Sequence, residues 1–375
     1  MFFSDKVLRN DEKAIYSLRE LYRKYGYTQF KVSRFEEYDL YARNKSFLVN
    51  ENVLTFTDTN GKLMALKPDV TLSIIKNIAT EDLGTHKLYY NENVYRPSPE
   101  AGGFKEIMQT GLECVGNVDL FSTGEVIMLA AKSLEVISDD YILDVSHMGL
   151  VEGLMDGAGV ADEDRATLLS YVKSKNTAAI EQFGRDGKMS ASQSNLLCEL
   201  TKMYLPLEDA LEAVKNSALN DKMSEAYNEL VGLSEIMKAY GLDKKLYLDL
   251  SVVNDRNYYD GIIFKGFING IPDGVLSGGR YNKLLEKMGK KCGAIGFAVY
   301  LDRLERFGHD EGEYDVDALL IYDNDVRAED VICAVRELGK DGRTVMTSAS
   351  VDKSIRCRQT FRIKREGVST LETDD

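Results

Sequence analysis

Three polar segments of the chain have the composition of a binding site for a small charged molecule. Asp69 and Thr71 lie where a predicted strand stops and a helix begins, and Arg96 starts a long loop between two strands. Gln109 and Glu113 are four residues apart on a predicted strand, and this even spacing puts both side chains on one face. A buried carboxylate needs a partner, and a ligand cation is one candidate.

These segments also have purely structural explanations. Asp69 can simply cap the following helix, and this is the favoured explanation when the residue is considered alone. Gln109 and Glu113 can line a solvated sheet face, although the apolar Leu112 and Cys114 share their strand without a simple alternation. The residue types alone therefore leave both explanations open.

A fourth group of residues concentrates tyrosine, glycine and arginine. One segment, Asn254–Gly261, contains the pair Tyr258 and Tyr259, and a second runs from Ser277 to Tyr281 and continues through 293–304. Paired tyrosines serve packing more often than ligand recognition. A lone Gly-Gly-Arg-Tyr is weak evidence for a binding site, because glycines are common in turns. The order and spacing of all these segments together are far more specific.

Hydrophobic periodicity and turn residues predict the elements that must position these side chains. A helix with Asn10 as its N-cap and acids in its first turn is expected to end at Gly26. Strands are predicted at 28–32, 54–57, 63–66, 87–95, 107–115, 141–145, 246–253, 258–267 and 275–277. Further helices are predicted at 71–77, 123–137, 281–288 and 298–307.

The domain organisation follows from a change of pattern between about residues 150 and 242, where glycine-bounded amphipathic stretches predict a helical insertion. From about residue 316, a small α/β unit is expected, with strands at 318–322 and 344–347, helices at 328–338 and 353–358, and a final strand. We therefore expect four parts, at 1–149, 150–242, 243–312 and 313–375.

Composition limits the classes of function. The 375 residues are 44% hydrophobic without a run of about 18 apolar residues, and the N-terminus has no charged region followed by a long apolar stretch, so we expect a cytoplasmic protein without a membrane span. Five scattered cysteines and three histidines offer little for a metal site, and we expect neither metal nor cofactor. A net charge of −14 disfavours nucleic acid as a partner.

Taken in order, the polar segments resemble histidyl-tRNA synthetase and its paralogue, the regulatory subunit of ATP phosphoribosyltransferase. The resemblance covers most of residues 1–307 and implies an α+β fold of the class II aminoacyl-tRNA synthetase type: an antiparallel sheet flanked by helices, in a dimer. The resemblance also matches specific residues of this chain to the histidine-binding residues of the family. Asp69 and Thr71 match the segment that holds the amino group, where the synthetase has Glu instead of this Asp.

The remaining matches complete the expected histidine site. Gln109 and Glu113 match residues around the amino acid and its imidazole, and Tyr258 and Tyr259 match the paired tyrosines of the histidine-specific loop. Arg96 matches the arginine of the second class II motif, although its loop is one residue shorter here. These side chains offer complementary charge to an ammonium, a carboxylate and an imidazole.

The departures from the family pattern decide the expected function. Asn254 stands where the synthetase has a catalytic arginine, Gly103 replaces an arginine that contacts ATP, and Tyr300 replaces a glycine beside the nucleotide site. Loss of such charges removes transition-state stabilisation. Of that nucleotide set, only Arg303 clearly remains, and Ser33 stands where the first motif usually has proline.

The resemblance thus implies a noncatalytic regulatory subunit. It would bind histidine as effector, form a homodimer within a larger hetero-oligomer, and confer feedback control and activation on the catalytic subunit of ATP phosphoribosyltransferase, in the first step of histidine biosynthesis. The last α/β block resembles a short anticodon-binding domain, but tRNA is an unlikely partner for so acidic a chain. The alternatives are a divergent histidyl-tRNA synthetase and an amino-acid-binding protein with another partner.

Overall fold

A computed structural model describes residues 8–48, 52–78, 84–98, 102–217, 220–253, 258–304, 314–352, 354–365 and 367–371. The chain divides into two compact units, residues 1–307 and 308–375, which are described separately.

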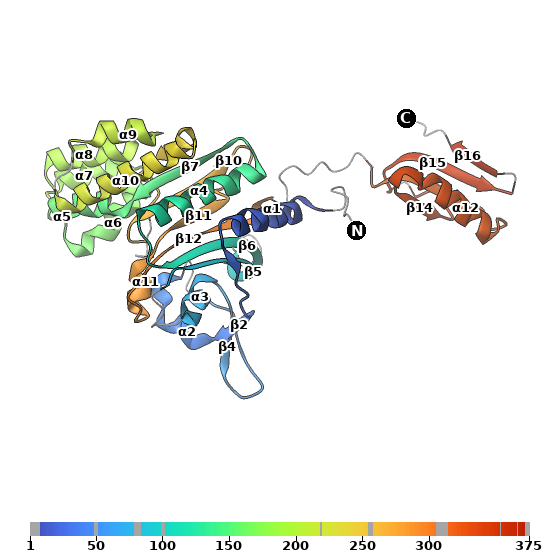
Figure 1. The fold of residues 1–375 in the computed structure, drawn as a ribbon, viewed down its shortest axis with the longest axis horizontal. Coiled ribbons are helices and arrows are strands. Elements are labelled where there is room, and N and C mark those ends of the chain that lie inside the picture. Colours follow the sequence, from blue (N-terminus) through green and yellow to red (C-terminus); the bar gives the residue numbers. More distant parts are fainter. Residues whose placement is uncertain are drawn as a thin grey trace. The chain divides into compact units, whose positions relative to one another are not determined.

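A nine-stranded sheet forms the centre of the first unit (Figure 1). Across the sheet the strands are β1 (Thr28–Gln29), β5 (His86–Ser98), β6 (Gly103–Gly116), β12 (Gly293–Tyr300), β11 (Leu276–Arg280), β10 (Ile262–Ile268), β7 (Tyr141–His147), β9 (Leu246–Leu248) and β8 (Leu205–Pro206). The six strands from β5 to β7 in this order are antiparallel to one another, whereas β1 pairs in parallel with β5 and β9 pairs in parallel with β7.

Strand β6 is an inner strand of this sheet, paired with β5 and β12, and it is buried on both faces from Gln109 onward. Leu112 and Cys114 point to the face covered by α1 (Asn10–Lys24) and α4 (Leu120–Ile137), where they join the main hydrophobic core. Gln109 and Glu113 point to the opposite face, as predicted from their spacing. The two-sided burial explains why β6 shows no simple alternation of apolar and polar residues.

Helices cover the two faces of the sheet differently, with α1 and α4 on one side and α2 and α3 on the other (Figure 1). The second side also carries a three-stranded sheet, in the order β2 (Phe35–Glu37), β4 (Leu63–Leu66) and β3 (Thr55–Thr57). The helices are α1 (Asn10–Lys24), α2 (Tyr38–Arg43), α3 (Thr71–Asn77), α4 (Leu120–Ile137) and α11 (Asn282–Lys287), with 3-10 turns at Lys45–Phe47 and Leu301–Leu304. Arg9, rather than Asn10, is the N-cap of α1, and its backbone N–H donates to Glu12.

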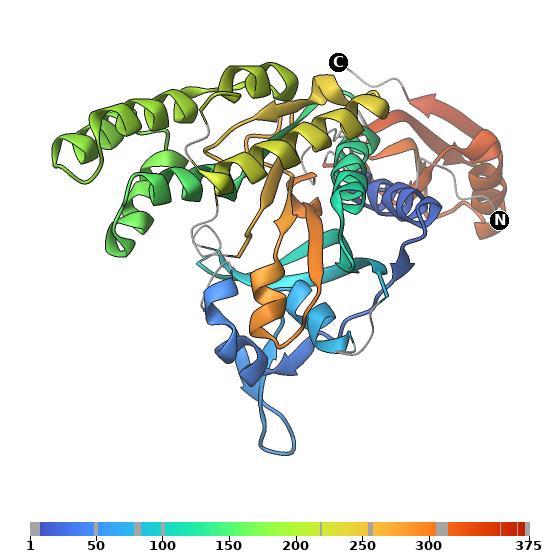
Figure 2. The ribbon, with the colours of Figure 1, turned by 60° about the vertical axis from the view of Figure 1, so that its left-hand side comes forward.

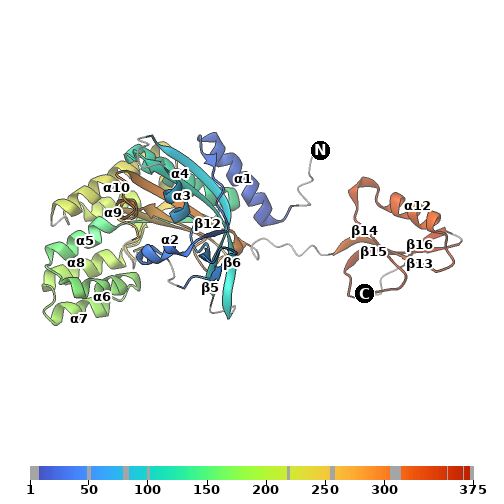
Figure 3. The same ribbon diagram turned by 90° about the horizontal axis from the view of Figure 1, so that it is seen from below.

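The segment between β7 and β9 is helical, and its green and yellow helices gather at one end of the sheet (Figures 2 and 3). Its longest helix, α10, also packs against α4 and α5. The helices of this segment are α5 (Met148–Gly157), α6 (Asp162–Lys173), α7 (Thr177–Arg185), α8 (Ala191–Lys202), α9 (Leu207–Val214) and α10 (Asp221–Ala239), followed by a 3-10 turn at Asp243–Lys245. We call this segment the helical insertion.

The second unit contains a four-stranded sheet and one α-helix, α12 (Ala328–Leu338), with a 3-10 turn at Lys340–Gly342. Leu320, Ala334 and Ile363 form its small buried core. The strand order is β14 (Val345–Ser348), β13 (Val316–Tyr322), β15 (Cys357–Lys364) and β16 (Gly367–Leu371).

Two predicted helices are wrong. The segment predicted as a helix at 298–307 continues strand β12 to Tyr300 and then forms a 3-10 turn to Leu304, while 305–307 lie outside the described residues. Strand β12 is paired on both sides and buried, so its apolar run carries no period-two signal. The helix predicted at 353–358 is also absent, because Cys357 begins strand β15, although residue 353 is not described.

Three strands are clearly shorter than predicted. The strand expected at 28–32 ends at Gln29, the strand expected at 246–253 ends at Leu248, and the strand expected at 258–267 begins only at Ile262. The residues removed from these strands include Tyr258 and Tyr259, which turn into the site described below. None of the helices in the described ranges combines the length and apolar character that a membrane span requires.

Candidate functional site

A cavity of about 400 Å³ lies over the face of the sheet opposite α4. Strands β6, β12, β11 and β10 supply its floor, and α3, the loop before β10 and the end of α6 supply its walls. The lining residues are Phe47, Leu48, Asp69, Thr71, Tyr90, Arg96, Gln109, Glu113, Lys173, Val253, Tyr258, Tyr259, Lys265, Ser277, Tyr281, Gly296, Phe297, Ala298 and Tyr300. All seven residues expected to bind histidine, namely Asp69, Thr71, Arg96, Gln109, Glu113, Tyr258 and Tyr259, are therefore brought together.

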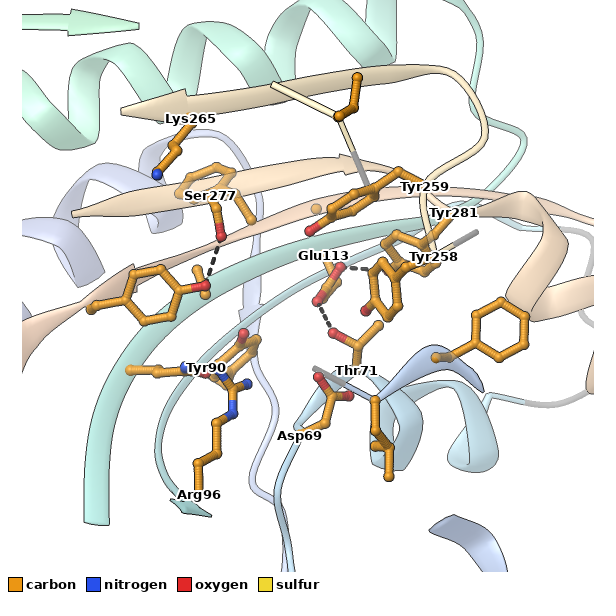
Figure 4. Close-up of a pocket in the computed structure, with 18 of the residues that line it drawn as sticks. Asp69, Thr71, Tyr90, Arg96, Glu113, Tyr258, Tyr259, Lys265, Ser277 and Tyr281 are labelled. Carbon is orange, nitrogen blue, oxygen red and sulfur yellow. Dashed lines mark hydrogen bonds between the residues drawn. The ribbon is translucent and has the colours of Figure 1, made fainter. Parts of the chain in front are cut away.

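Glu113 is the central buried acid of the cavity, with only 2% of its surface exposed. Thr71 Oγ1 donates to its Oε1 at 2.8 Å, and the Tyr281 hydroxyl donates to its Oε2 at 2.5 Å (Figure 4). Burial raises the pKa of Glu113 to about 8, against the opposing effect of these two hydrogen bonds, and the nearby Asp69 adds to the increase. Burial therefore favours the protonated, neutral form of Glu113.

Glycines of the sheet make room for the functional side chains. A Cβ atom on Gly296 would lie 1.7 Å from Glu113 Oε2, and one on Gly111 would lie 2.1 Å from the ring of Tyr90. A Cβ atom on Gly279 would lie 2.7 Å from the Tyr259 ring. These contacts are too short for any larger residue, so a side chain at one of these glycines would displace Glu113, Tyr90 or Tyr259 from its place in the cavity.

Asp69 both contacts the start of α3 and lines the cavity. Val70 is the N-cap residue of this helix, but Asp69 Oδ1 accepts a hydrogen bond from the Leu72 backbone N–H at 2.9 Å. Burial raises the pKa of Asp69, while the Leu72 N–H and the nearby Arg96 guanidinium lower it. Arg96 itself is held by a hydrogen bond from its Nε to the Pro68 carbonyl at 2.8 Å.

Gln109 supplies an unpaired polar group to the cavity. Its side chain is 2% exposed, and among the described residues nothing accepts a hydrogen bond from its amide nitrogen Nε2. A buried N–H group without a partner is unfavourable by about 1–3 kcal/mol. An acceptor atom on a ligand, such as a carboxylate oxygen, would remove this cost.

Tyr258 and Tyr259 form an aromatic wall. Their rings meet edge to face at 4.7 Å between centroids, and Tyr258 also contacts Tyr281 at 5.9 Å. Burial raises the pKa of each hydroxyl well above its usual range, so all three stay neutral donors. Such a wall fixes the orientation of a planar ligand group.

Tyr300 lines the far end of the cavity, away from Glu113 along strand β12. Its hydroxyl and the Ser277 hydroxyl are hydrogen-bonded at 2.6 Å. Arg303, which the resemblance matches to a nucleotide-binding arginine, stacks on the Tyr300 ring at 5.0 Å and donates to the Gly274 carbonyl, and it does not line the cavity. Gly103 begins β6 and does not line the cavity, and Asn254 lies outside the described residues.

Sequence reasoning missed several lining residues, including Tyr281, Tyr90, Lys173 and Lys265. Tyr281 stands in the Gly-Gly-Arg-Tyr segment, so its position was marked although its role was not. Lys173 comes from α6 of the helical insertion and Lys265 from β10, and neither has a local pattern that points to the cavity. In the described ranges, no group of three His, Cys, Asp or Glu side chains is placed to hold a metal ion.

The arrangement suits recognition of a small zwitterion that carries a second polar group. Figure 4 shows Glu113 between Thr71 and Tyr281, with Asp69 and Arg96 to one side of the cavity. Two acids and one arginine can pair with a cation and an anion of the same molecule. Apolar and aromatic walls with a few placed polar groups are typical of a small-molecule site.

Comparison with known proteins places the fold. The profile of the histidyl-tRNA synthetase family matches residues 3–304. The ATP phosphoribosyltransferase regulatory subunit of Caldanaerobacter subterraneus subsp. tengcongensis is 33% identical over 292 residues, which are 76% of this chain and 75% of that protein.

Two solved structures are similar as well. An ATP phosphoribosyltransferase regulatory subunit/histidyl-tRNA synthetase from Bacillus halodurans aligns with a TM-score of 0.76 at 23% identity, over 94% of this chain and 93% of that one. A chain of the ATP phosphoribosyl transferase (HisG:HisZ) complex from Thermotoga maritima aligns with a TM-score of 0.61 at 21% identity, over 78% and 97%. Together with the family match, they confirm the predicted class II synthetase-like α+β fold.

Proposed function

The chain belongs to the histidyl-tRNA synthetase family and, within it, to the regulatory subunits of ATP phosphoribosyltransferase. From this membership we propose that the chain binds free histidine and regulates a separate catalytic subunit. In this proposal it catalyses no reaction itself. It confers activation and histidine feedback on the first step of histidine biosynthesis, as a homodimer within a hetero-oligomer.

The observation that carries the proposal is the position of Glu113 on the cavity floor. Its carboxyl group, held by Thr71 and Tyr281, lies beside the Tyr258 and Tyr259 wall, where an imidazole ring would fit. Asp69 would pair with the ammonium, while Arg96 and the free amide of Gln109 would take the carboxylate. Thr71 would orient the acid between them.

Ionisation adds selectivity for histidine. Empty, the cavity favours a protonated Glu113, because burial penalises the charged form. An imidazole can accept this proton and remain paired with the carboxylate, which an apolar side chain of similar size cannot do. An amino acid without a basic ring would leave Glu113 protonated and without a matching ligand group.

The far end of the cavity supports a noncatalytic role. The Tyr300 ring fills space there, and Arg303 is engaged by Tyr300 and the Gly274 carbonyl. Asn254 and Gly103 stand where the synthetase has arginines, so two cationic groups that would stabilise an acyl-phosphate reaction are replaced by uncharged residues. The residues matched to the histidine site are retained, whereas most of those matched to the nucleotide site are replaced.

Regulation requires that histidine bind one state of the assembly better than another, which gives a coupling free energy between this cavity and the partner's catalytic site. The direct experiment is calorimetric titration of the chain with histidine, followed by reconstitution with the candidate catalytic subunit. We expect saturable histidine binding, and inhibition by histidine only when this chain is present. Absence of binding, or equal inhibition of the catalytic subunit alone, would refute the proposal.

A divergent histidyl-tRNA synthetase is the second candidate, because Arg96 and Arg303 are retained. Pyrophosphate exchange with histidine and ATP separates the two functions. We expect no sustained exchange, and steady turnover that persists after rigorous purification would establish the synthetase instead.

A further inference from the structure

Arg280 connects the cavity with the helical insertion. It ends strand β11, and the next residue, Tyr281, donates its hydroxyl hydrogen bond to Glu113 inside the cavity. The Arg280 guanidinium points the other way, toward Glu229 on α10. Its two terminal nitrogens donate to the two oxygens of Glu229, with Nη2 at 3.0 Å from Oε2. Arg280 thus contacts the helical insertion through its side chain, and its neighbour in the sequence, Tyr281, contacts Glu113 in the cavity.

The same guanidinium also fixes the segment after Tyr259. A Cβ atom on Gly261 would lie 2.1 Å from Nη2 of Arg280, so the guanidinium crosses the backbone where only glycine leaves room. Arg280 Nε lies 3.8 Å from Asp260 Oδ1, and the Asp260 backbone N–H donates to the Arg280 carbonyl at 3.0 Å. The position of Tyr259 therefore depends on that of Arg280.

Glu229 is itself held from a second side. His147 Nδ1 accepts a hydrogen bond from the Gly149 N–H at 3.0 Å, so the proton of the neutral ring lies on Nε2, which is 2.7 Å from Glu229 Oε2. Burial tends to raise the pKa of Glu229, but the hydrogen bonds from His147 and Arg280 lower it to about 2. The Glu229 carboxylate is thus negatively charged, and it joins α10 to β7 through His147 and to β11 through Arg280.

We propose that Arg280 is a positioning residue for the tyrosines of the cavity, and that its pair with Glu229 couples occupancy of the cavity to the position of the helical insertion. The coupling rests on the proposed histidine site, whereas the positioning role does not. A shift of α10 would move Arg280 and with it both neighbouring segments, Tyr258–Asp260 and Tyr281. A ligand that fixes those tyrosines would, by the same linkage, favour one position of α10.

Hydrogen exchange of the ligand-free protein tests the positioning role. The probes are the backbone amides of Asp260, which donates to Arg280, and of Met148, which donates to the Gly261 carbonyl. We expect Glu229→Gln to speed their exchange by about 2- to 30-fold, and Arg280→Lys to do the same because lysine cannot span both carboxylate oxygens. Amides of β12 should keep their wild-type rates.

The matched control is Glu208→Gln, which removes an exposed ion pair between α9 and α10. It should leave the Asp260 and Met148 amides unchanged. Unchanged exchange at these amides in Glu229→Gln would overturn the positioning role, and so would an equal increase throughout β12, since that pattern is general destabilisation.

A second set of measurements adds histidine. In the wild type, we expect protection of Asp260 and of the α10 amides around Glu229, whereas Glu229→Gln should bind histidine more weakly and protect only Asp260. If wild-type histidine binding leaves α10 unprotected, the coupling is wrong while the histidine site stands. If histidine does not bind the wild type at all, the proposed function and the coupling both fail, and the ligand-free measurements still decide whether Arg280 positions the tyrosines.

Discussion

Gly296 and Glu113 face each other across strands β12 and β6, and the carboxylate of Glu113 occupies the space that a side chain on Gly296 would fill. The site thus depends on a residue with no functional group of its own. A substitution there displaces the acid without changing it.

Gly296→Ala is the first test of this relationship. The new methyl group must push Glu113 away, so we expect overpacking that lowers the free energy of unfolding by about 1–3 kcal/mol. Histidine affinity should fall with it. Gly103→Ala on β6 is the control, because a Cβ atom there meets nothing within 4 Å. Calorimetry and urea unfolding measure both effects, and normal affinity in Gly296→Ala would contradict the placement of Glu113.

Glu113→Gln should make the unliganded protein relatively more stable as the pH rises. The pKa of Glu113 is about 8 in the folded protein, compared with 4.5 for a free glutamate side chain. Its contribution to stability is therefore present below about pH 4.5 and lost as the pH rises through about 8. A neutral amide does not suffer this loss.

Thermal unfolding at several pH values measures this difference. The melting temperature of Glu113→Gln relative to wild type should increase from about pH 5 to about pH 9. Histidine affinity of the variant should meanwhile fall by roughly 10- to 100-fold, since a charged hydrogen bond is lost. A pH-independent difference in melting temperature would show that Glu113 is ionised in the empty cavity.

Tyr259→Ala should abolish detectable histidine binding while the far-ultraviolet circular dichroism remains that of the wild type. The ring forms one wall of the cavity, and its removal exposes the ligand face to water. Tyr259→Phe keeps the wall and loses only the hydroxyl, so a decrease of roughly 2- to 13-fold is expected.

Tyr16→Ala, at an exposed position of α1, is the matched control for loss of a tyrosine. It should bind histidine as the wild type does. Equal affinity of Tyr259→Ala and Tyr16→Ala would place the histidine site elsewhere.

Reconstitution with the catalytic subunit should show reciprocal effects. If histidine bound in this cavity weakens substrate binding to the assembly, the substrates must weaken histidine binding by the same coupling factor. Glu113→Gln should still assemble and activate but respond to histidine only at much higher concentrations. Sedimentation verifies assembly, and an unaltered inhibition curve for Glu113→Gln would move the effector site to another surface.

Local periodicity predicted the parts of the site that lie on one strand or at one helix start. The even spacing of Gln109 and Glu113 was sufficient to place them on one face of β6, and Asp69 was placed correctly at the start of α3. Tyr281 could not be paired with Glu113 in this way, because 168 residues separate them.

A strand that is buried on both faces does not show the alternation of polar and apolar residues from which a strand is predicted. Tyr300 was assigned to a helix because strand β12 has an apolar run without alternation. The contacts of Arg280 with Glu229 and Gly261 also needed the structure, since they depend on how the helical insertion packs against the sheet.

The continuous pairing of β6 with β5 on one side and β12 on the other has a consequence for the history of such genes. Side chains alternate between the two sheet faces, so adding or removing one codon within β6 would turn Gln109 and Glu113 toward α4 and bring apolar residues into the cavity. Single substitutions can adjust this site stepwise, whereas a small insertion or deletion in β6 would eliminate it at once. Length changes in related genes should therefore accumulate outside this strand.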